Sequence, residues 1–147
     1  MAGGGAMSDE RIFMLCNAAV VPGWLLLAAR PHWKYTQRVC AVIIPVILAV
    51  AYLTLFVVNF KGLHGGFLSL AAIAYMFQQP ETLLAAWIHF LAFDLFVGSW
   101  EVRDAQRVKV PHLAVIPCLL LTFLLGPAGL LAYFIVRSVM RHGVEAL

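Results

Sequence analysis

The chain has 147 residues, of which 63% are hydrophobic and only 12% are charged. A soluble globular domain carries about 25% charged residues, so this composition excludes a soluble globule and indicates an integral membrane protein. The formal net charge of +3 is spread over the loops, and no basic run resembles a nucleic-acid footprint, so we expect no nucleic-acid partner.

The chain divides into a short leader, one membrane domain and a short tail. We expect residues 1–8, which are rich in glycine, to be a disordered leader, residues 9–142 to form a single transmembrane helical domain, and residues 143–147 to be a tail. Spanning helices are predicted over 11–29 and 39–60, because each holds about the 20 mainly apolar residues that a span needs.

The second half of the chain contains one short and two long apolar segments. The apolar run within 67–79 is shorter than a span, so we predict an interfacial or re-entrant segment there. Spanning helices are predicted over 82–100, with a helical continuation to 106, and over 112–136. The predicted fold is all-α and polytopic: a bundle of four transmembrane helices with a short interfacial or re-entrant segment between the second and the third.

Basic residues are concentrated in two of the predicted loops, 30–38 and 103–109. The positive-inside rule places these loops in the cytoplasm and both chain termini on the other side. The leader is too short and too rich in glycine for a plastid transit peptide, so we expect the plasma or inner membrane of a bacterium.

The third predicted helix holds the ionisable residues that lie deepest in apolar surroundings. These are His89 and Asp94, with Glu101 at the edge of the span. Ionisable groups inside a membrane are costly and usually face the protein interior at a functional site. At about 100° per residue, His89 and Asp94 lie about 140° apart around the helix, so they need not touch each other.

Two stripes of residues on this helix follow from the same geometry. His89 shares one stripe with Phe93 and Trp100, and Asp94 shares the other with residues that include Trp87, Gly98 and Glu101. Gly98 would allow a neighbouring helix or a ligand to approach closely.

Two interpretations of Asp94 remain open. It is either a structural clamp that bonds a polar group on another helix, or part of a functional site. Because polar groups inside a membrane need partners, we expect Asn17, Thr54 and Thr122 to face the third helix near Asp94.

Several segments resemble the abscisic-acid-deficient type of membrane protein, also called the neoxanthin synthase-like family. They are Asn17, Pro22 to Leu27, His89 to Asp104 and Pro117 to Gly129, and the block from His89 to Trp100 is the most specific. Plant members of that family are linked to the synthesis of neoxanthin from violaxanthin, and many others have no known function. The resemblance implies a protein that rearranges or binds a long isoprenoid inside the bilayer.

Acid–base chemistry would suffice for such a rearrangement. Opening an epoxide and shifting a double bond requires one proton donor and one proton acceptor. We expect Asp94 to donate the proton, His89 to act as the base, and Glu101 to resupply protons at the water boundary. No cofactor is expected, and the three cysteines stand singly, without the paired spacing of a metal site.

The alternative is a non-enzymatic accessory protein that binds carotenoids or lipids. In both cases the expected partners are membrane lipids and an apolar isoprenoid ligand, and a homo-oligomer is left open. The residues that we expect to bind the ligand are Asn17, Trp87, Phe93, Gly98, Trp100 and Thr122.

Overall fold

A computed structural model of the protein describes residues 8–59 and 65–145, with side chains described up to residue 140. The predicted leader, apart from Ser8, therefore lies outside the described residues, as do Lys61 and the last two residues of the predicted tail. The elements are α1 (Asp9–Ala29), α2 (Thr36–Arg38), the π-helical turn η1 (Val39–Ile43), α3 (Ile44–Asn59), α4 (Leu70–Met76), α5 (Pro80–Val108), α6 (His112–Leu125) and α7 (Pro127–Glu145). These ranges contain no strand, so the predicted all-α class is confirmed.

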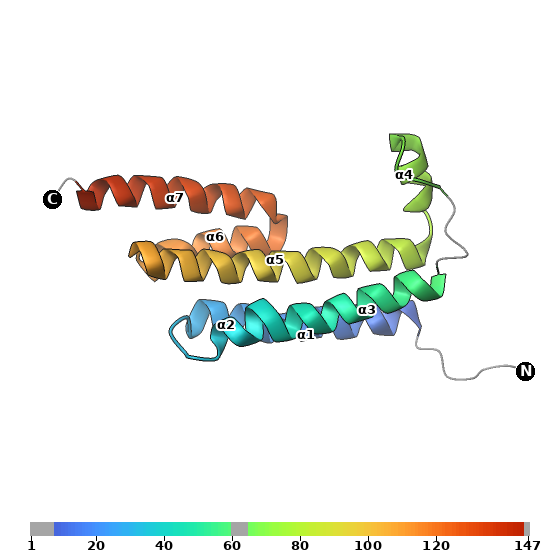
Figure 1. Ribbon diagram of the computed structural model, residues 1–147, viewed down its shortest axis with the longest axis horizontal. Helices are drawn as coiled ribbons and strands as arrows, with labels where there is room; N and C mark the ends of the chain where they lie inside the picture. The colour runs from blue at the N-terminus through green and yellow to red at the C-terminus, as the bar shows by residue number, and fades with distance from the viewer. Residues whose placement is uncertain (1–7, 60–64, 146–147) are drawn as a thin grey trace, which may run out of the picture.

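Three helices are long and apolar enough to cross a membrane. They are α1, the continuous helix Thr36–Asn59 and α5, with 21, 24 and 29 residues. At about 1.5 Å per residue, each is at least as long as the hydrocarbon core of a bilayer is thick, about 30 Å. Figure 1 shows them running side by side, and α5 packs against both α1 and α3. They coincide with the first three predicted spans.

The predicted fourth span, a continuous helix over 112–136, is wrong. α6 ends at Leu125, and α7 runs back along it as the second arm of a hairpin (Figure 1). Pro127 has no N–H to bond the carbonyl four residues back, and Gly126 has φ +47° and ψ −97°, which residues with a side chain avoid. A Cβ atom at Gly129 would overlap the backbone of Thr122, so the two arms touch at their backbones. The glycines and proline of this segment therefore permit a reversal, and with α7 packed on α6 the chain turns back here and does not merely bend.

The short segment before α5 forms α4, a helix of seven residues that is too short to cross a bilayer. The hydroxyl of Ser69 caps it by accepting a hydrogen bond of 3.1 Å from the backbone N–H of Ala72. Figure 1 shows α4 standing across the direction of the long helices at the start of α5. Phe67, Leu68 and Leu70 nearby are exposed, as expected of a segment that contacts the membrane interface.

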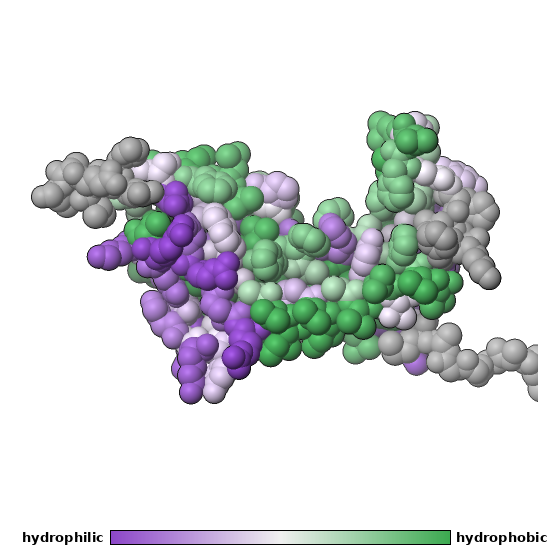
Figure 2. All heavy atoms as spheres, in the orientation of Figure 1, coloured by the Kyte–Doolittle hydropathy of each residue, from purple (hydrophilic) through white to green (hydrophobic). Residues whose placement is uncertain are grey.

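The two predicted basic loops lie together at one end of the bundle. Gln106 donates a 2.8 Å hydrogen bond to the carbonyl of Pro31, and His112 lies 2.9 Å from the carbonyl of Ala28. Figure 2 shows hydrophilic residues gathered at this end. Because the hairpin returns α7 to the same end, Arg137 lies beside the basic loops. The predicted placement of the C-terminus at the opposite end is therefore wrong.

Candidate functional site

His89 lies in an apolar cavity between α3, α4 and the first half of α5. The cavity has a volume of about 300 Å³ and its lining includes Tyr52, Met76 and Phe90. The imidazole stacks on Phe93, with 4.4 Å between the ring centroids, and lies 6.0 Å from the ring of Tyr52. Stacking on a fixed aromatic ring orients the imidazole and leaves it open to a molecule in the cavity.

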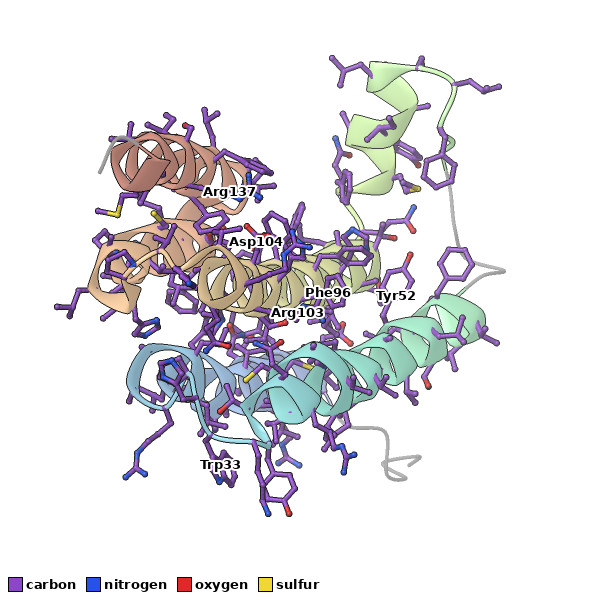
Figure 3. The ribbon with its side chains drawn as sticks, turned by 60° about the vertical axis from the view of Figure 1, so that its left-hand side comes forward. Trp33, Tyr52, Phe96, Arg103, Asp104 and Arg137 are labelled. Carbon is purple, nitrogen blue, oxygen red and sulfur yellow. The ribbon has the colours of Figure 1, made fainter. Side chains whose placement is uncertain are left out.

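A second apolar hollow, of about 310 Å³, lies farther along the same two helices, α3 and α5. It is lined by Pro45, Val46, Ala49, Ala92, Phe93 and Phe96. On α3 the lining residues of both hollows follow helical spacing from Pro45 to Asn59, a length of about 21 Å at 1.5 Å per residue. We call these two hollows together the α3–α5 groove. Figure 3 shows Tyr52 and Phe96, which contribute to it from the two helices.

Asp94 lies on the neighbouring stripe of α5, against the turn of the hairpin. A Cβ atom at Gly126 would stand 2.8 Å from Asp94 Oδ1. The carboxyl is only partly buried and forms no hydrogen bond or ion pair with any residue that the structure describes. The group with which it interacts electrostatically is His89. Helix α5 thus places one acidic and one basic group about 140° apart around its axis, close enough for their charges to interact but without a bond between them.

The predicted polar partners of Asp94 lie elsewhere. Asn17 donates to the carbonyl of Phe13 and accepts a 3.3 Å hydrogen bond from Trp87, about two turns before Asp94. Thr54 is exposed and bonds the carbonyl of Val50 in its own helix. Thr122 approaches Glu101 instead. None of the three predicted residues therefore clamps Asp94.

Glu101 is not at the water boundary as predicted. Its side chain is 0% exposed, because the hairpin covers this part of α5. Its Oε1 lies 2.8 Å from the hydroxyl of Thr122, whereas its Oε2 is buried with no hydrogen-bond partner among the described residues. The sequence places Glu101 next to the basic loop, and only the reversal of the chain encloses it.

Asp104, which from the sequence alone lies merely near a helix end, is the centre of a polar cluster. It is 3% exposed, and its two oxygens receive bonds of 2.8 Å from Arg107, 2.6 Å from Arg137 and 2.8 Å from the hydroxyl of Tyr133. Figure 3 shows Asp104 and Arg137 facing each other from α5 and α7. The spacing of Arg107 to Asp104 is visible in the sequence, but the other two partners require the hairpin. This cluster fixes the hairpin to α5.

The remaining predicted ligand-binding residues serve contacts between helices. The ring of Trp24 on α1 occupies the space beside Gly98, where a Cβ atom would stand 2.7 Å from Trp24 Cζ3. The predicted close approach of a neighbouring helix at Gly98 is therefore confirmed. Trp100 packs on Tyr133 and Phe134 of α7, at 5.7 and 5.6 Å between centroids. Of the predicted set, only His89 and Phe93 line the groove. The others lie elsewhere: Asn17 and Trp87 bond each other between α1 and α5, Asp94 lies against the hairpin turn, and Gly98, Trp100, Glu101 and Thr122 lie under other helices.

Within the described ranges, no three histidine, cysteine, aspartate or glutamate side chains come together as metal ligands. The three cysteines, Cys16, Cys40 and Cys118, are buried and unpaired. Their surroundings are those of small packing residues.

Comparison with known proteins relates the chain to one family. The ABA DEFICIENT 4-like family profile matches residues 11–133. The chain is also 28% identical over 142 residues to "Protein ABA DEFICIENT 4, chloroplastic" of Arabidopsis thaliana, an alignment that covers 89% of this chain and 62% of the plant protein. The chain thus spans less than two thirds of the length of that relative. No solved structure matches the chain. The plant relative is chloroplastic, and nothing in the comparisons supports the bacterial membrane expected from the sequence.

Proposed function

The chain belongs to the ABA DEFICIENT 4-like family, and on that premise we propose that it binds a carotenoid-like isoprenoid in the α3–α5 groove and isomerises it by acid–base chemistry. Asp94 is the proposed acid and His89 the proposed base. The family relation supports a carotenoid-associated function, and the arrangement of side chains supports the assignment of roles.

The groove suits a long apolar ligand that enters from the bilayer. Its lining is almost wholly apolar, it extends for about 21 Å, and Phe90, Phe93 and Phe96 along it are about half exposed. A ligand dissolved in the membrane reaches such a surface sideways, without passing through water.

The observation that carries the proposal is the free carboxyl of Asp94. A buried clamp is hydrogen-bonded, because an unsatisfied polar group in an apolar medium is costly. Asp94 instead has neither a hydrogen bond nor an ion pair with any described residue, and it is partly open. A carboxyl kept free in the middle of a membrane helix is typical of a functional group.

The reaction proposed is an isomerisation of an epoxide. Asp94 gives its proton to the epoxide oxygen as the C–O bond breaks, and His89 removes a proton from a neighbouring carbon, whose electrons form the new double bond. The product has the same composition as the substrate, because a hydroxyl group and a new double bond replace the epoxide ring. His89 and Asp94 lie five residues apart, about 7.5 Å along the helix axis and about 140° around it. The substrate therefore has to extend out of the groove and across α5 to the hairpin turn to reach both.

The membrane arrangement proposed with this function has three spanning helices and a hairpin, α6 and α7, that enters and leaves at the basic end. α6 has 14 residues, about 21 Å, which is too short for an upright span. The hairpin turn then lies at the depth of Asp94, where backbone without helical bonds is tolerated only inside protein.

Expression in a carotenoid-making bacterial host tests this proposal against the accessory-protein alternative. Pigments bound to the purified protein and pigments of the whole cell are separated by chromatography. Conversion of an epoxy-carotenoid into an isomer, absent from cells with an empty vector, supports the enzyme. A protein that retains pigment but leaves its composition unchanged is a binder, and the acid–base proposal then fails.

A further inference from the structure

The buried carboxyl of Glu101 has no positive partner among the side chains that the structure describes. The described ion pairs are those of Asp104 with Arg107 and Arg137, and Arg137 is therefore already engaged. The titratable side chains that interact electrostatically with Glu101 from the packed helices are Cys118 and Tyr133, neither of which is a cation. An ionised Glu101 would thus hold an unpaired negative charge in an enclosed, largely apolar interior, which is strongly unfavourable.

The hydrogen bonds around Thr122 decide which atom holds the proton. Thr122 Oγ1 lies 2.8 Å from Glu101 Oε1 and 3.0 Å from the carbonyl oxygen of Cys118. A hydroxyl has one hydrogen to donate, and a carbonyl oxygen can only accept. Both contacts become full hydrogen bonds only if Thr122 donates to Cys118 and Glu101 donates to Thr122, which requires a proton on Glu101.

From this geometry we propose that Glu101 is a neutral carboxylic acid in the resting protein and stores one proton. The hydrogen bonds run in one direction, from Glu101 Oε1–H to Thr122 Oγ1 and from Thr122 O–H to the carbonyl of Cys118. The remaining oxygen, Oε2, is then a neutral acceptor, whose lack of a donor costs far less than a stranded charge would.

A role for the stored proton follows if the proposed function holds. Glu101 lies seven residues after Asp94 on the same stripe of α5, about 10.5 Å along the axis toward the basic end. After Asp94 has given its proton to the substrate, Glu101 replaces that proton and becomes a carboxylate. Glu101 is then protonated from water at the basic end, while His89 releases to water the proton that it removed from the substrate, so the cycle takes up no net proton. Glu101 is thereby a reserve acid that touches no substrate.

Infrared difference spectroscopy of the purified protein tests the storage directly. We expect the wild-type spectrum minus that of Glu101→Gln to contain a carboxylic-acid carbonyl band that shifts in heavy water. Thr122→Val removes the hydrogen-bond acceptor and should move this band to higher frequency. Glu10→Gln is the matched control, because Glu10 is exposed and its loss should remove carboxylate bands alone. Carboxylate bands for Glu101, with no acid band, would overturn the proposal.

This measurement uses no substrate, so its outcome is separate from that of the proposed function. Where the protein converts pigment, Glu101→Gln should retain the first turnover and slow later ones about tenfold or more, with an unchanged KM. An equally slow first turnover would overturn the role as reserve acid and would leave the infrared result in place.

Discussion

Asp94 on α5 lies directly against Gly126, the residue at which the C-terminal hairpin reverses, so that a Cβ atom on Gly126 would stand 2.8 Å from the carboxyl oxygen Oδ1. The acid that lies deepest in the third predicted span and the turn that replaces the fourth predicted span are thus in contact. The hairpin reverses at the depth of the Asp94 carboxyl and leaves the first half of α5 open to the groove.

We predict that Gly126→Ala destabilises the protein. Alanine would have to adopt φ +47° and would meet the Asp94 carboxyl, at a cost of about 1–3 kcal/mol. Thermal unfolding in detergent measures the loss. Gly66→Ala is the control, because a Cβ atom there meets nothing within 4 Å, and similar losses in both variants would contradict the prediction.

The Asp104 cluster is predicted to hold the hairpin on α5. Asp104→Ala leaves Tyr133 and Arg137 without their acceptor and should lower the free energy of unfolding by about 3 kcal/mol or more. Arg107→Gln should cost less than about 1 kcal/mol, because the Arg107 side chain is 75% exposed. Chemical unfolding of both variants gives the comparison, and equal effects would show that the cluster does not fix α7.

The hairpin also makes a prediction about topology. Single cysteines at Lys34 and Ser138, both exposed, should react with a membrane-impermeant reagent from the same side of the membrane. The native cysteines are buried and give a low background. A cysteine at Arg11, at the other end of α1, should react from the opposite side. If Ser138→Cys reacted from the same side of the membrane as Arg11→Cys, the hairpin would be contradicted and the four-span arrangement supported.

Much of this arrangement is predictable from the sequence. The three long helices, α4 and the meeting of the basic loops follow from apolar length and charge, which act locally. The hairpin does not, because Gly126 and Pro127 are equally compatible with a kinked span, and only packing of α7 on α6 selects reversal. The burial of Glu101 and the contacts of Asp104 with Tyr133 and Arg137 depend on that reversal. The spacing of residues along the sequence therefore could not predict them.

Filling the groove should prevent binding. Ala86 lines the cavity beside His89, and Ala86→Trp would occupy much of its roughly 300 Å³. We expect pigment recovered with the purified protein to fall about tenfold, the equivalent of 1.4 kcal/mol. Val139→Trp, on an exposed position of α7, should leave the recovered pigment unchanged. Unaltered pigment in Ala86→Trp would place the ligand outside the α3–α5 groove.

The most direct test of the acid–base proposal is the rate of pigment conversion by Asp94→Asn. Asparagine keeps the shape and polarity of the side chain but has no transferable acid proton. With protein level and bound pigment equal to those of the wild type, conversion should fall by roughly a hundredfold or more, while Asp9→Asn at the start of α1 should convert normally. Conversion at the wild-type rate by a well-expressed Asp94→Asn protein would contradict the assignment of Asp94 as the acid.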